Sequence, residues 1–374
     1  MKEVLISFYK YLLICLFAAA IIYVPLSSYS KKIIERTDKR FYMDFAKNKS
    51  NSYVPFKYSL SAELYMLNYM IYNFKPANNI IFFGASNTQN GVIADNLILP
   101  AKWTLYNCAE GITGKTIYNY SLFFDLIEKN ANHVPDKNDI IVLHLHCRTF
   151  TDNKNYLKEL QNNIELFGYF KVDKNNRVQG SLNKYKRFWK TSNFAIRLAC
   201  SLFIGYDTYL TPDYRLMLFI KDVVKEKFSH TKKKAEISSD EKFFSNEEIE
   251  SFKKYFLSHM GETKIPGNTT EEFFKLINLM KKKTNIAVVN LYDPSWYDDL
   301  KIKQDYVNWL NNTLEPFLRS NSIPYIDFMR DIPDTLYYDQ AHLIKKGREK
   351  YTALFNNWFP QVLDNISPDT NQIK

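Results

Sequence analysis

Two parts of the chain alternate short apolar runs with longer stretches whose apolar residues recur at helical spacing. The runs that predict strands are residues 79–83, 103–108, 139–146, 285–291 and 324–328. The stretches that predict helices are residues 116–129, 270–282, 306–319 and 345–358. The run at 139–146 begins almost entirely apolar, as expected of a strand that is covered on both faces. Strands that alternate with helices predict an α/β fold with a parallel sheet.

Residues 150–268 break this alternation. They contain helical patterns at 194–204, 214–226 and 246–257, and a charged link at 230–242. We therefore predict an α-rich insertion beside the sheet, acting as a lid or as a binding surface. Its many aromatic residues suit stacking on a sugar, although ordinary core packing uses the same residue types.

The N-terminal segment is nearly free of charge, since Lys10 is the only charged residue between positions 6 and 28. A membrane-spanning helix needs about 20 mostly apolar residues, and this segment reaches that length if Lys10 extends to the interface. A cleaved signal peptide is the alternative, but no Ala-x-Ala site comes after the apolar run, so we predict an uncleaved anchor. Basic residues at 31–40 favour a cytoplasmic position for the segment on the C-terminal side of the helix, whereas a long domain can be translocated despite such a bias.

A chain of 374 residues can hold one large α/β domain with an insertion, or two domains. The predicted organisation is an anchor at 1–29, a stalk and lead-in helix at 30–76, the first part of the α/β domain at 77–149, the insertion at 150–268, the second part of the domain at 269–360 and a tail at 361–374. Residues 58–74 have the apolar spacing of the lead-in helix, and an amphipathic helix in solvent or on a membrane is the alternative.

The charge distribution and the absence of two motifs argue against nucleic-acid binding and nucleotide binding. The chain has 50 Lys and Arg against 40 Asp and Glu, a net charge of +10 and a pI near 9.1. The basic residues are scattered and form no stripe, so we predict no nucleic-acid binding. The turn at 84–87 lacks both G-x-G-x-x-G and the Walker Lys-Ser/Thr pair, which argues against a nucleotide site.

The four cysteines indicate no zinc site, because no Cys-x-x-Cys pair occurs. Cys108 and Cys147 each fall at a predicted strand end and could approach each other, but two buried free thiols are the simpler expectation. His144 and His146 are two apart on one strand, as two metal ligands could be, but no third ligand is apparent. We predict no metal and no cofactor.

One strand end carries a candidate nucleophile. The apolar run at 80–83 is followed by Gly84, Ala85 and Ser86, and sites in open α/β sheets lie at the carboxyl ends of the strands. A serine needs a base and a third group that orients the base. His342 is the candidate base, and Asp339, three residues earlier, can reach its Nδ1 atom. A single Ser after a strand is more often a turn or helix N-cap, so the distant Asp-x-x-His pattern carries the prediction.

Glycine is scarce, which makes its placing informative. The chain has ten glycines, and Gly84, Gly91, Gly111, Gly114 and Gly347 all lie in or beside these segments. An acyl-transfer site also needs preorganised N–H donors for an oxyanion. The backbone N–H groups of Ser86 and Gly114 are the candidates, because glycine lets the backbone approach a substrate closely.

Together these blocks resemble the SGNH (GDSL-like) hydrolase superfamily over residues 77–149 and 270–358. The blocks are Gly84-Ala85-Ser86, Asn107 with Gly111 and Gly114, and Asp339-x-x-His342 with Gly347. The chain is more closely similar to the membrane-anchored acyltransferase-like branch, which includes D-alanine transfer and alginate O-acetylation proteins. The resemblance implies a three-layer, flavodoxin-like parallel sheet, Ser86 as nucleophile, His342 as base, Asp339 as its orienter and Gly114 as an oxyanion donor.

One block departs from the family pattern. The family places Gly-x-Asn-Asp after its third strand, where the Asn donates to the oxyanion, but this chain has Leu145, His146, Cys147, Arg148 and Thr149. Arg148 or His146 could replace that donor or bind an anionic substrate. Asn107 could hydrogen-bond to the Ser86 loop or form a strand-end turn.

By analogy with that branch, we expect a membrane-anchored serine acyltransferase or esterase with its domain outside the cytoplasm. Its substrates would be O-acyl groups of a cell-envelope polysaccharide or glycolipid, and its partners an acyl donor, a polysaccharide acceptor and a membrane-bound O-acyltransferase. The alternative is a non-catalytic SGNH-like protein that binds a glycan or scaffolds a membrane acyltransferase.

Overall fold

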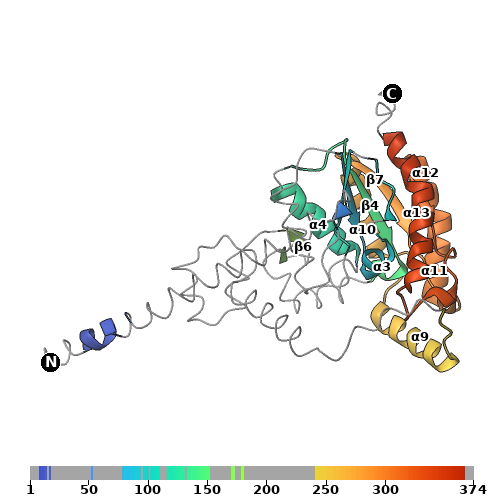
Figure 1. Ribbon diagram of the computed structural model, residues 1–374, viewed down its shortest axis with the longest axis horizontal. Helices are drawn as coiled ribbons and strands as arrows, with labels where there is room; N and C mark the ends of the chain where they lie inside the picture. Colours follow the sequence, from blue (N-terminus) through green and yellow to red (C-terminus); the bar gives the residue numbers. More distant parts are fainter. Residues whose placement is uncertain are drawn as a thin grey trace. The chain divides into compact units, whose positions relative to one another are not determined.

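The computed structural model describes residues 78–151, except 94–95, 101, 110–115 and 131–132, together with residues 241–366 and short pieces at 8–14, 17, 52–53, 170–172 and 178–180. The chain divides into two units, one of residues 1–47 with 183–231 and the other of residues 48–182 with 232–374. All the described residues except 8–14 and 17 belong to the second unit, which holds the sheet and the candidate site (Figure 1).

Six parallel strands form the main sheet. They are β1 (Ser52–Tyr53), β2 (Asn78–Phe83), β3 (Trp103–Asn107), β4 (Ile140–Leu145), β7 (Asn285–Asn290) and β8 (Tyr325–Asp327). Their order is β1-β3-β2-β4-β7-β8. Without the short edge strand β1, this is the flavodoxin-like order 2-1-3-4-5 of doubly wound folds. The predicted parallel α/β sheet is confirmed, and each predicted strand lies within two residues of its observed ends.

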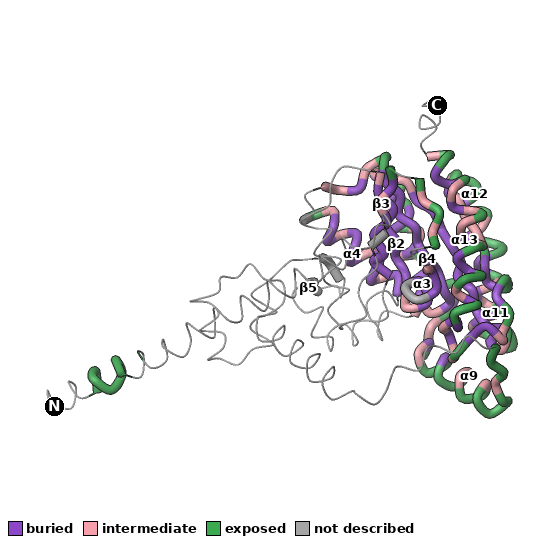
Figure 2. Tube along the Cα trace, in the orientation of Figure 1, coloured by how far each residue is buried: buried purple, intermediate pink, exposed green. Residues whose placement is uncertain are grey.

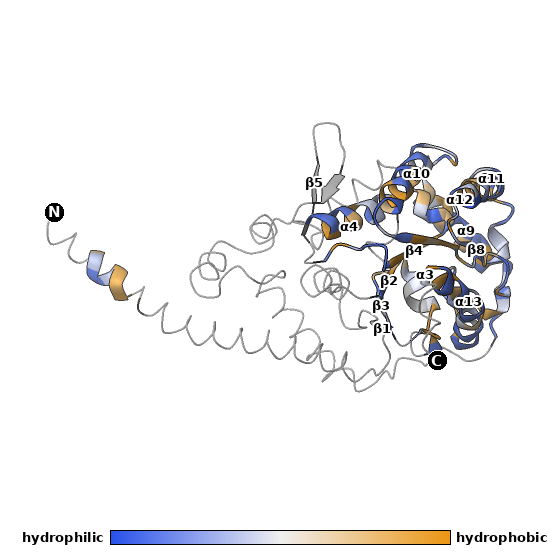
Figure 3. Cartoon of the chain, turned by 90° about the horizontal axis from the view of Figure 1, so that it is seen from above, coloured by the Kyte–Doolittle hydropathy of each residue, from blue (hydrophilic) through white to orange (hydrophobic). Residues whose placement is uncertain are grey.

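Helices cover both faces of the sheet, as the top view shows (Figure 3). One face carries α4 (Ile117–Asn130), α10 (Asn268–Lys281), α11 (Lys301–Trp309) and α12 (Glu315–Ser320), and the other carries α3 (Ser86–Gly91) and α13 (Lys345–Ile366). Successive side chains of a strand point to opposite faces. The Phe82 ring therefore packs on Phe355 of α13, at 5.5 Å between centroids, while Phe83 packs on Tyr120 of α4 at 5.9 Å.

The centre of the sheet is fully buried, as Figure 2 shows. The four apolar residues that end β2 have no exposed surface: Ile80, Ile81, Phe82 and Phe83. Burial of both faces explains why β2 and β4 are continuous apolar runs and do not alternate with polar residues.

Two predicted helices have different boundaries in the structure. The predicted helix at 306–319 is a continuous helical stretch of α11, one π-helical turn (Leu310–Leu314) and α12. The closing helix α13 runs beyond the predicted end at residue 358 and contains Pro360 before it ends at Ile366. Proline removes one backbone N–H donor, but the helix continues beyond it and buries Val362 and Leu363.

The region predicted as an α-rich insertion also contains strands. Helix α9 (Asn246–Met260) agrees with the predicted helix at 246–257, and Ser245 and Glu248 form a capping box at its start. The strands β5 (Phe170–Val172) and β6 (Val178–Gly180) form an antiparallel pair that was not predicted. The predicted helices at 58–74, 194–204 and 214–226 lie outside the described residues.

The predicted anchor at 1–29 lies mostly outside the described residues, of which it includes only 8–14 and 17, all helical and exposed. Among the described residues, none of the helices combines the length and the apolar character that crossing a membrane requires. The anchor therefore stays a prediction.

Truncation of the β2 core should be costly. We expect Phe82→Ala to lower the free energy of unfolding by about 3–5 kcal/mol, because it leaves a cavity between the sheet and α13. Phe243→Ala is the control, since Phe243 is 79% exposed, and its effect should stay within about 0.5 kcal/mol. Denaturant unfolding of both variants measures the difference, and equal shifts would contradict this account of the core.

Candidate active site

Ser86 lies where the strand order reverses. It is the first residue of α3 and comes after β2, Gly84 and Ala85. In this topology the sheet is extended outward on both sides from β2 and β4, and doubly wound sheets bind ligands outside the carboxyl ends of the strands at this point. The α3 segment is held there by the Tyr292 hydroxyl, which donates a hydrogen bond to the Asn87 carbonyl oxygen at 2.8 Å.

The structure brings Ser86, His342 and Asp339 into direct contact. The His342 Nε2 atom is 2.9 Å from Ser86 Oγ, although the two residues are 256 positions apart. On the other side of the ring, Nδ1 lies 2.9 Å from Asp339 Oδ2 and 3.0 Å from Oδ1. These contacts have the order required of a nucleophile, a base and an orienting carboxylate.

Asp339 is held by its own loop. Its Oδ1 atom accepts hydrogen bonds from the backbone N–H groups of Ala341 and His342, both at 2.8 Å. Burial raises the pKa of Asp339, but the hydrogen bond and charge of His342 and these two N–H groups outweigh it, so the pKa is below its ordinary value. The carboxylate is therefore ionised at neutral pH and fixes the tautomer that leaves His342 Nε2 free to accept a proton.

Tyr338 covers the imidazole, a role that sequence patterns did not reveal. Its ring stacks on His342 with 5.6 Å between centroids and an angle of 21°. Burial raises the pKa of Tyr338 to about 12, and the neighbouring Asp339 carboxylate adds to this, so the hydroxyl stays neutral. The Tyr338 carbonyl oxygen accepts a hydrogen bond from Lys242 Nζ at 2.9 Å. This bond connects the loop that carries His342 to the segment just before α9.

Close packing explains why glycine is placed beside the site. A Cβ atom on Gly84 would lie 2.2 Å from Thr88 Oγ1 of α3, and one on Gly347 would lie 2.7 Å from the Leu336 carbonyl oxygen. A Cβ atom on Gly91 would meet the Tyr292 hydroxyl at 2.6 Å. The glycine pattern therefore reflects close approach at these three positions. Gly111 and Gly114 lie outside the described residues, so Gly114 as an oxyanion donor stays a prediction.

Asn107 closes a turn at the end of β3. Its Oδ1 atom accepts a hydrogen bond from the Ala109 N–H at 3.1 Å, and the residue is 1% exposed. Of the two alternatives from the sequence, this contact favours the strand-end turn over a hydrogen bond to the Ser86 loop.

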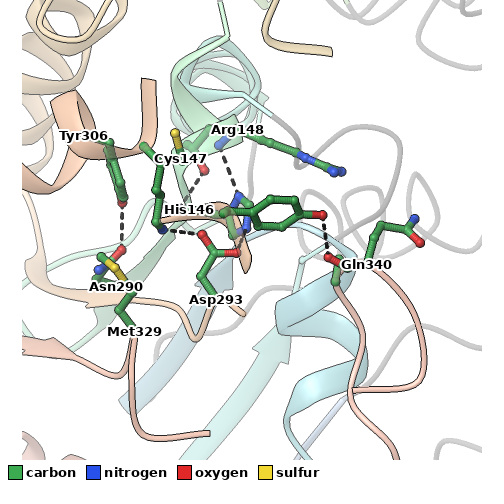
Figure 4. Close-up of polar contacts among 12 residues, drawn as sticks. His146, Cys147, Arg148, Asn290, Asp293, Tyr306, Met329 and Gln340 are labelled. Carbon is green, nitrogen blue, oxygen red and sulfur yellow. Dashed lines mark hydrogen bonds and ion pairs between the residues drawn. The ribbon is translucent and has the colours of Figure 1, made fainter. Parts of the chain in front are cut away.

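His146 is part of a buried ion cluster, shown in Figure 4. Its Nε2 atom lies 3.2 Å from Asp293 Oδ1, and Asp293 also pairs with Lys303. His146, Asp293 and Lys303 are 7%, 2% and 1% exposed. The His146 Nδ1 atom accepts the Arg148 backbone N–H at 3.1 Å, so Nε2 carries the ring proton and donates it to Asp293. Both ring nitrogens are thus engaged within the protein, whereas two guanidinium nitrogens of Arg148, Nε and Nη2, have no hydrogen-bond partner among the described residues.

Electrostatics keep this cluster charged at Asp293 and neutral at His146. Burial raises the pKa of Asp293, but the Lys303 charge and the His146 contact outweigh it, so the pKa lies well below its ordinary value. Burial lowers the pKa of His146 despite the neighbouring Asp293 carboxylate. Burial of Lys303 was not predicted: it lies in α11, before the start of the helix predicted at 306–319, and lysine is rarely fully buried unless paired.

His144 packs in the core and lies apart from the His146 contacts. It has no exposed surface, its ring packs against Phe82 and Phe355, and its Nδ1 atom is 3.3 Å from the Phe83 carbonyl oxygen. Burial lowers the pKa of His144 to about 3, so the ring is neutral. This environment is that of a packed strand residue.

One group of described residues has the spacing of a metal site, namely His133, Asp136 and Asp139. It lies at the amino ends of β2 and β4, opposite Ser86. Both Asp139 oxygens already have partners: Oδ1 accepts from Asn79, and Oδ2 contacts His133 and the Asp136 N–H. These contacts explain the grouping without a metal, because they join the starts of β2 and β4.

Cys108 and Cys147 are buried thiols outside any disulfide, as expected. Burial raises the pKa of Cys147 to about 12 and that of Cys108 still further, so neither thiol is a nucleophile at neutral pH.

No protein-family model and no curated protein matches the chain. A member of the lipolytic protein G-D-S-L family from Veillonella parvula DSM 2008 is similar at 11% identity over 76% of this chain and 98% of its own, with a TM-score of 0.37. A protein named as an acylhydrolase from Bacteroides fragilis NCTC 9343 is similar at 10% identity over 83% and 98%, also with a TM-score of 0.37. At such TM-scores the contacts of the site itself, and not these neighbours, must support a function.

Loss of the Asp293 carboxylate should destabilise the protein, because it leaves Lys303 buried without a counter-charge. We expect Asp293→Ala to lower the free energy of unfolding by about 3–5 kcal/mol. Asp298→Ala is the matched control: Asp298 pairs with Arg330 at an exposed position, where an ion pair contributes about 0–1 kcal/mol. The double variant Asp293→Leu with Lys303→Met should recover part of the loss, because apolar side chains of similar volume can replace a buried ion pair. A double variant that is no more stable than Asp293→Ala would contradict this explanation.

Proposed function

We propose that this protein transfers acyl groups through a covalent acyl-serine at Ser86. The observation that carries the proposal is the unbroken series of contacts from Ser86 Oγ to His342 Nε2, and from His342 Nδ1 to Asp339. His342 and Asp339 are partly exposed, at 19% and 25% of their side-chain surface, so a substrate can reach the edge of the sheet where they lie.

The reaction has two steps. Ser86 Oγ attacks the carbonyl carbon of an ester or thioester while His342 Nε2 takes the hydroxyl proton. The tetrahedral intermediate collapses, the bond to the alcohol or thiol breaks, and His342 returns the proton to that leaving group. Water or an acceptor hydroxyl then attacks the acyl-serine by the same route, which regenerates Ser86. Asp339 stabilises the imidazolium that forms in both steps.

The tetrahedral intermediate needs N–H donors aimed at its oxygen. We propose the backbone N–H of Ser86 and that of Gly114, which the SGNH resemblance assigns to this role. The Asn that the family adds after its third strand has no counterpart here, and the short helical turn Cys147–Phe150, with Arg148, follows β4. This difference favours an acyl transferase over a general esterase.

The substrate class and location in the proposal come from the SGNH resemblance and the N-terminal apolar segment. We propose that residues 1–29 anchor the protein with its α/β domain outside the cytoplasm, where O-acyl groups of an envelope polysaccharide or glycolipid are transferred or removed. Under this proposal a membrane-bound O-acyltransferase supplies the acyl donor.

The nucleophile can be tested by covalent labelling. We expect a fluorophosphonate probe to label the wild-type protein but not Ser86→Ala, and short-chain ester hydrolysis to fall about 10⁴-fold or more. Ser320→Ala is the control, because Ser320 lies exposed on α12, and it should be labelled like wild type. If the folded wild-type protein takes up no Ser86-dependent label, the non-catalytic binding or scaffold function is favoured.

The location can be tested separately. A reporter that is active only outside the cytoplasm, fused after residue 374, should be active with the full chain and inactive when residues 1–29 are deleted. A cytoplasmic signal from the full-length fusion would overturn the polysaccharide part of the proposal and leave the chemistry of Ser86 untouched.

A further inference from the structure

Arg148 follows β4, the strand that pairs with β2, and Ser86 follows β2. Arg148 belongs to the short helical turn Cys147–Phe150, which comes directly after β4. Since both strands are parallel, the residues after them emerge at the same edge. Arg148 and Ser86 therefore stand on neighbouring strand ends.

The turn that carries Arg148 is held rigidly. The Arg148 backbone N–H donates to His146 Nδ1 at 3.1 Å, and the His146 N–H donates to Thr149 Oγ1 at 3.1 Å. His146 is in turn fixed by Asp293, which pairs with buried Lys303. The buried ion cluster thus positions the arginine in advance of any ligand.

The Arg148 guanidinium packs on aromatic rings, which in turn contact the loop that carries Asp339 and His342. The Arg148 guanidinium carbon is 5.3 Å from the ring centroids of both Tyr255 and Phe256 of α9. Phe256 stacks on Tyr297 at 4.6 Å between centroids, and the Tyr297 hydroxyl donates to the Gln340 carbonyl oxygen at 3.0 Å. Gln340 lies between Asp339 and His342 in the chain. Tyr255, Phe256 and Tyr297 therefore form an aromatic wall between Arg148 and the loop that carries Asp339 and His342.

The Arg148 charge changes the pKa of Tyr297, one of the residues of this aromatic wall. Burial raises the pKa of Tyr297 to about 12, while the Arg148 charge lowers it and the Asp339 charge raises it. These directions agree with the contacts that lead from Arg148 through Phe256 and Tyr297 to Gln340.

Arg148 has donors to offer. Among the described residues, its Nε and Nη2 atoms are buried and have no hydrogen-bond partner. The nearby Asp293 carboxylate is already bound to Lys303 and His146. A buried donor on a cation is costly to leave unpaired, and the guanidinium fork matches the two oxygens of a carboxylate or phosphate. Arginine over aromatic rings is also held in one orientation.

We propose that Arg148 binds an anionic group of the substrate, a carboxylate or a phosphate, beside the ester that Ser86 attacks. This inference rests on the proposed function and deepens it, because it makes the preferred substrate a negatively charged ester or acceptor. Arg148 is then a specificity residue that holds the substrate, while Ser86, His342 and Asp339 perform the chemistry.

Binding is tested first, without turnover. Calorimetric titration of the Ser86→Ala protein with inorganic phosphate and, separately, with succinate shows which anion is held. We expect one of them to bind, Ser86→Ala with Arg148→Met to bind it about 10- to 100-fold more weakly, and Arg148→Lys to lose less than Arg148→Met. Arg319→Met is the control, because Arg319 is 80% exposed on α12. If neither anion binds, or if Arg148→Met binds as well as its parent, the proposal is overturned.

Kinetics then distinguish the two roles that Arg148 could have. With para-nitrophenyl butyrate as the neutral ester and the para-nitrophenyl monoester of succinate as the anionic one, Arg148→Met should lose kcat/KM mainly on the anionic ester, through KM. An equal loss of kcat on both esters would assign Arg148 to the oxyanion and overturn the proposal.

Failure of the two proposals would look different. Anion binding that depends on Arg148 in a protein without Ser86-dependent turnover would reject the acyl-transfer function and retain the anion site. Thermal unfolding of each variant shows whether it is folded, and Arg148→Lys, which keeps the charge over the aromatic rings, decides the question if Arg148→Met is unfolded.

Discussion

The parallel pairing of β2 with β3 and β4 is the constraint on which the rest of the molecule depends. Because β2 is buried on both faces and paired on both edges, it cannot shift in register without exposing its apolar residues. Its carboxyl end is therefore a fixed point, and Ser86 lies just beyond it in the chain. The neighbouring strand β4 ends in the same way and presents Arg148. Two chemically useful side chains are thus positioned by one core.

A second constraint comes from the buried pair of Asp293 and Lys303. Such pairs are weak evidence for stability, because desolvation opposes their attraction. Here the pair has a positional consequence: Asp293 fixes His146, and His146 accepts the Arg148 backbone N–H. The Arg330 side chain also donates to the Asp293 carbonyl oxygen at 3.0 Å. The cluster thus links the ends of β4 and β7 to the segment after β8, all at the edge where the candidate site lies.

The loop that carries His342 is held by hydrogen bonds within the loop and by close packing against the start of α13. Asp339 accepts two N–H groups of its own turn, and Tyr337 pairs with Leu343 across the base of the loop. Gly347 lets the start of α13 approach Leu336, where a Cβ atom would collide with the backbone. The imidazole is therefore presented to Ser86 by a short loop with its own hydrogen bonds, and Tyr338 stacks on its ring.

The sequence by itself determined five of the six strands of the main sheet, the longer helices that flank them and α9, and the residue types gathered at the candidate site, since these depend on local patterns. The apolar run before Gly84 predicted β2 and the position of Ser86, and the spacing of three between Asp339 and His342 predicted their contact. Only the tertiary structure decided the strand order, the two-residue strand β1, the burial of Lys303, the turn at Asn107 and the aromatic wall around Arg148. These features depend on pairs of residues far apart in the chain, and hydrophobic periodicity reports which face of an element is buried but not which side chain it will meet there.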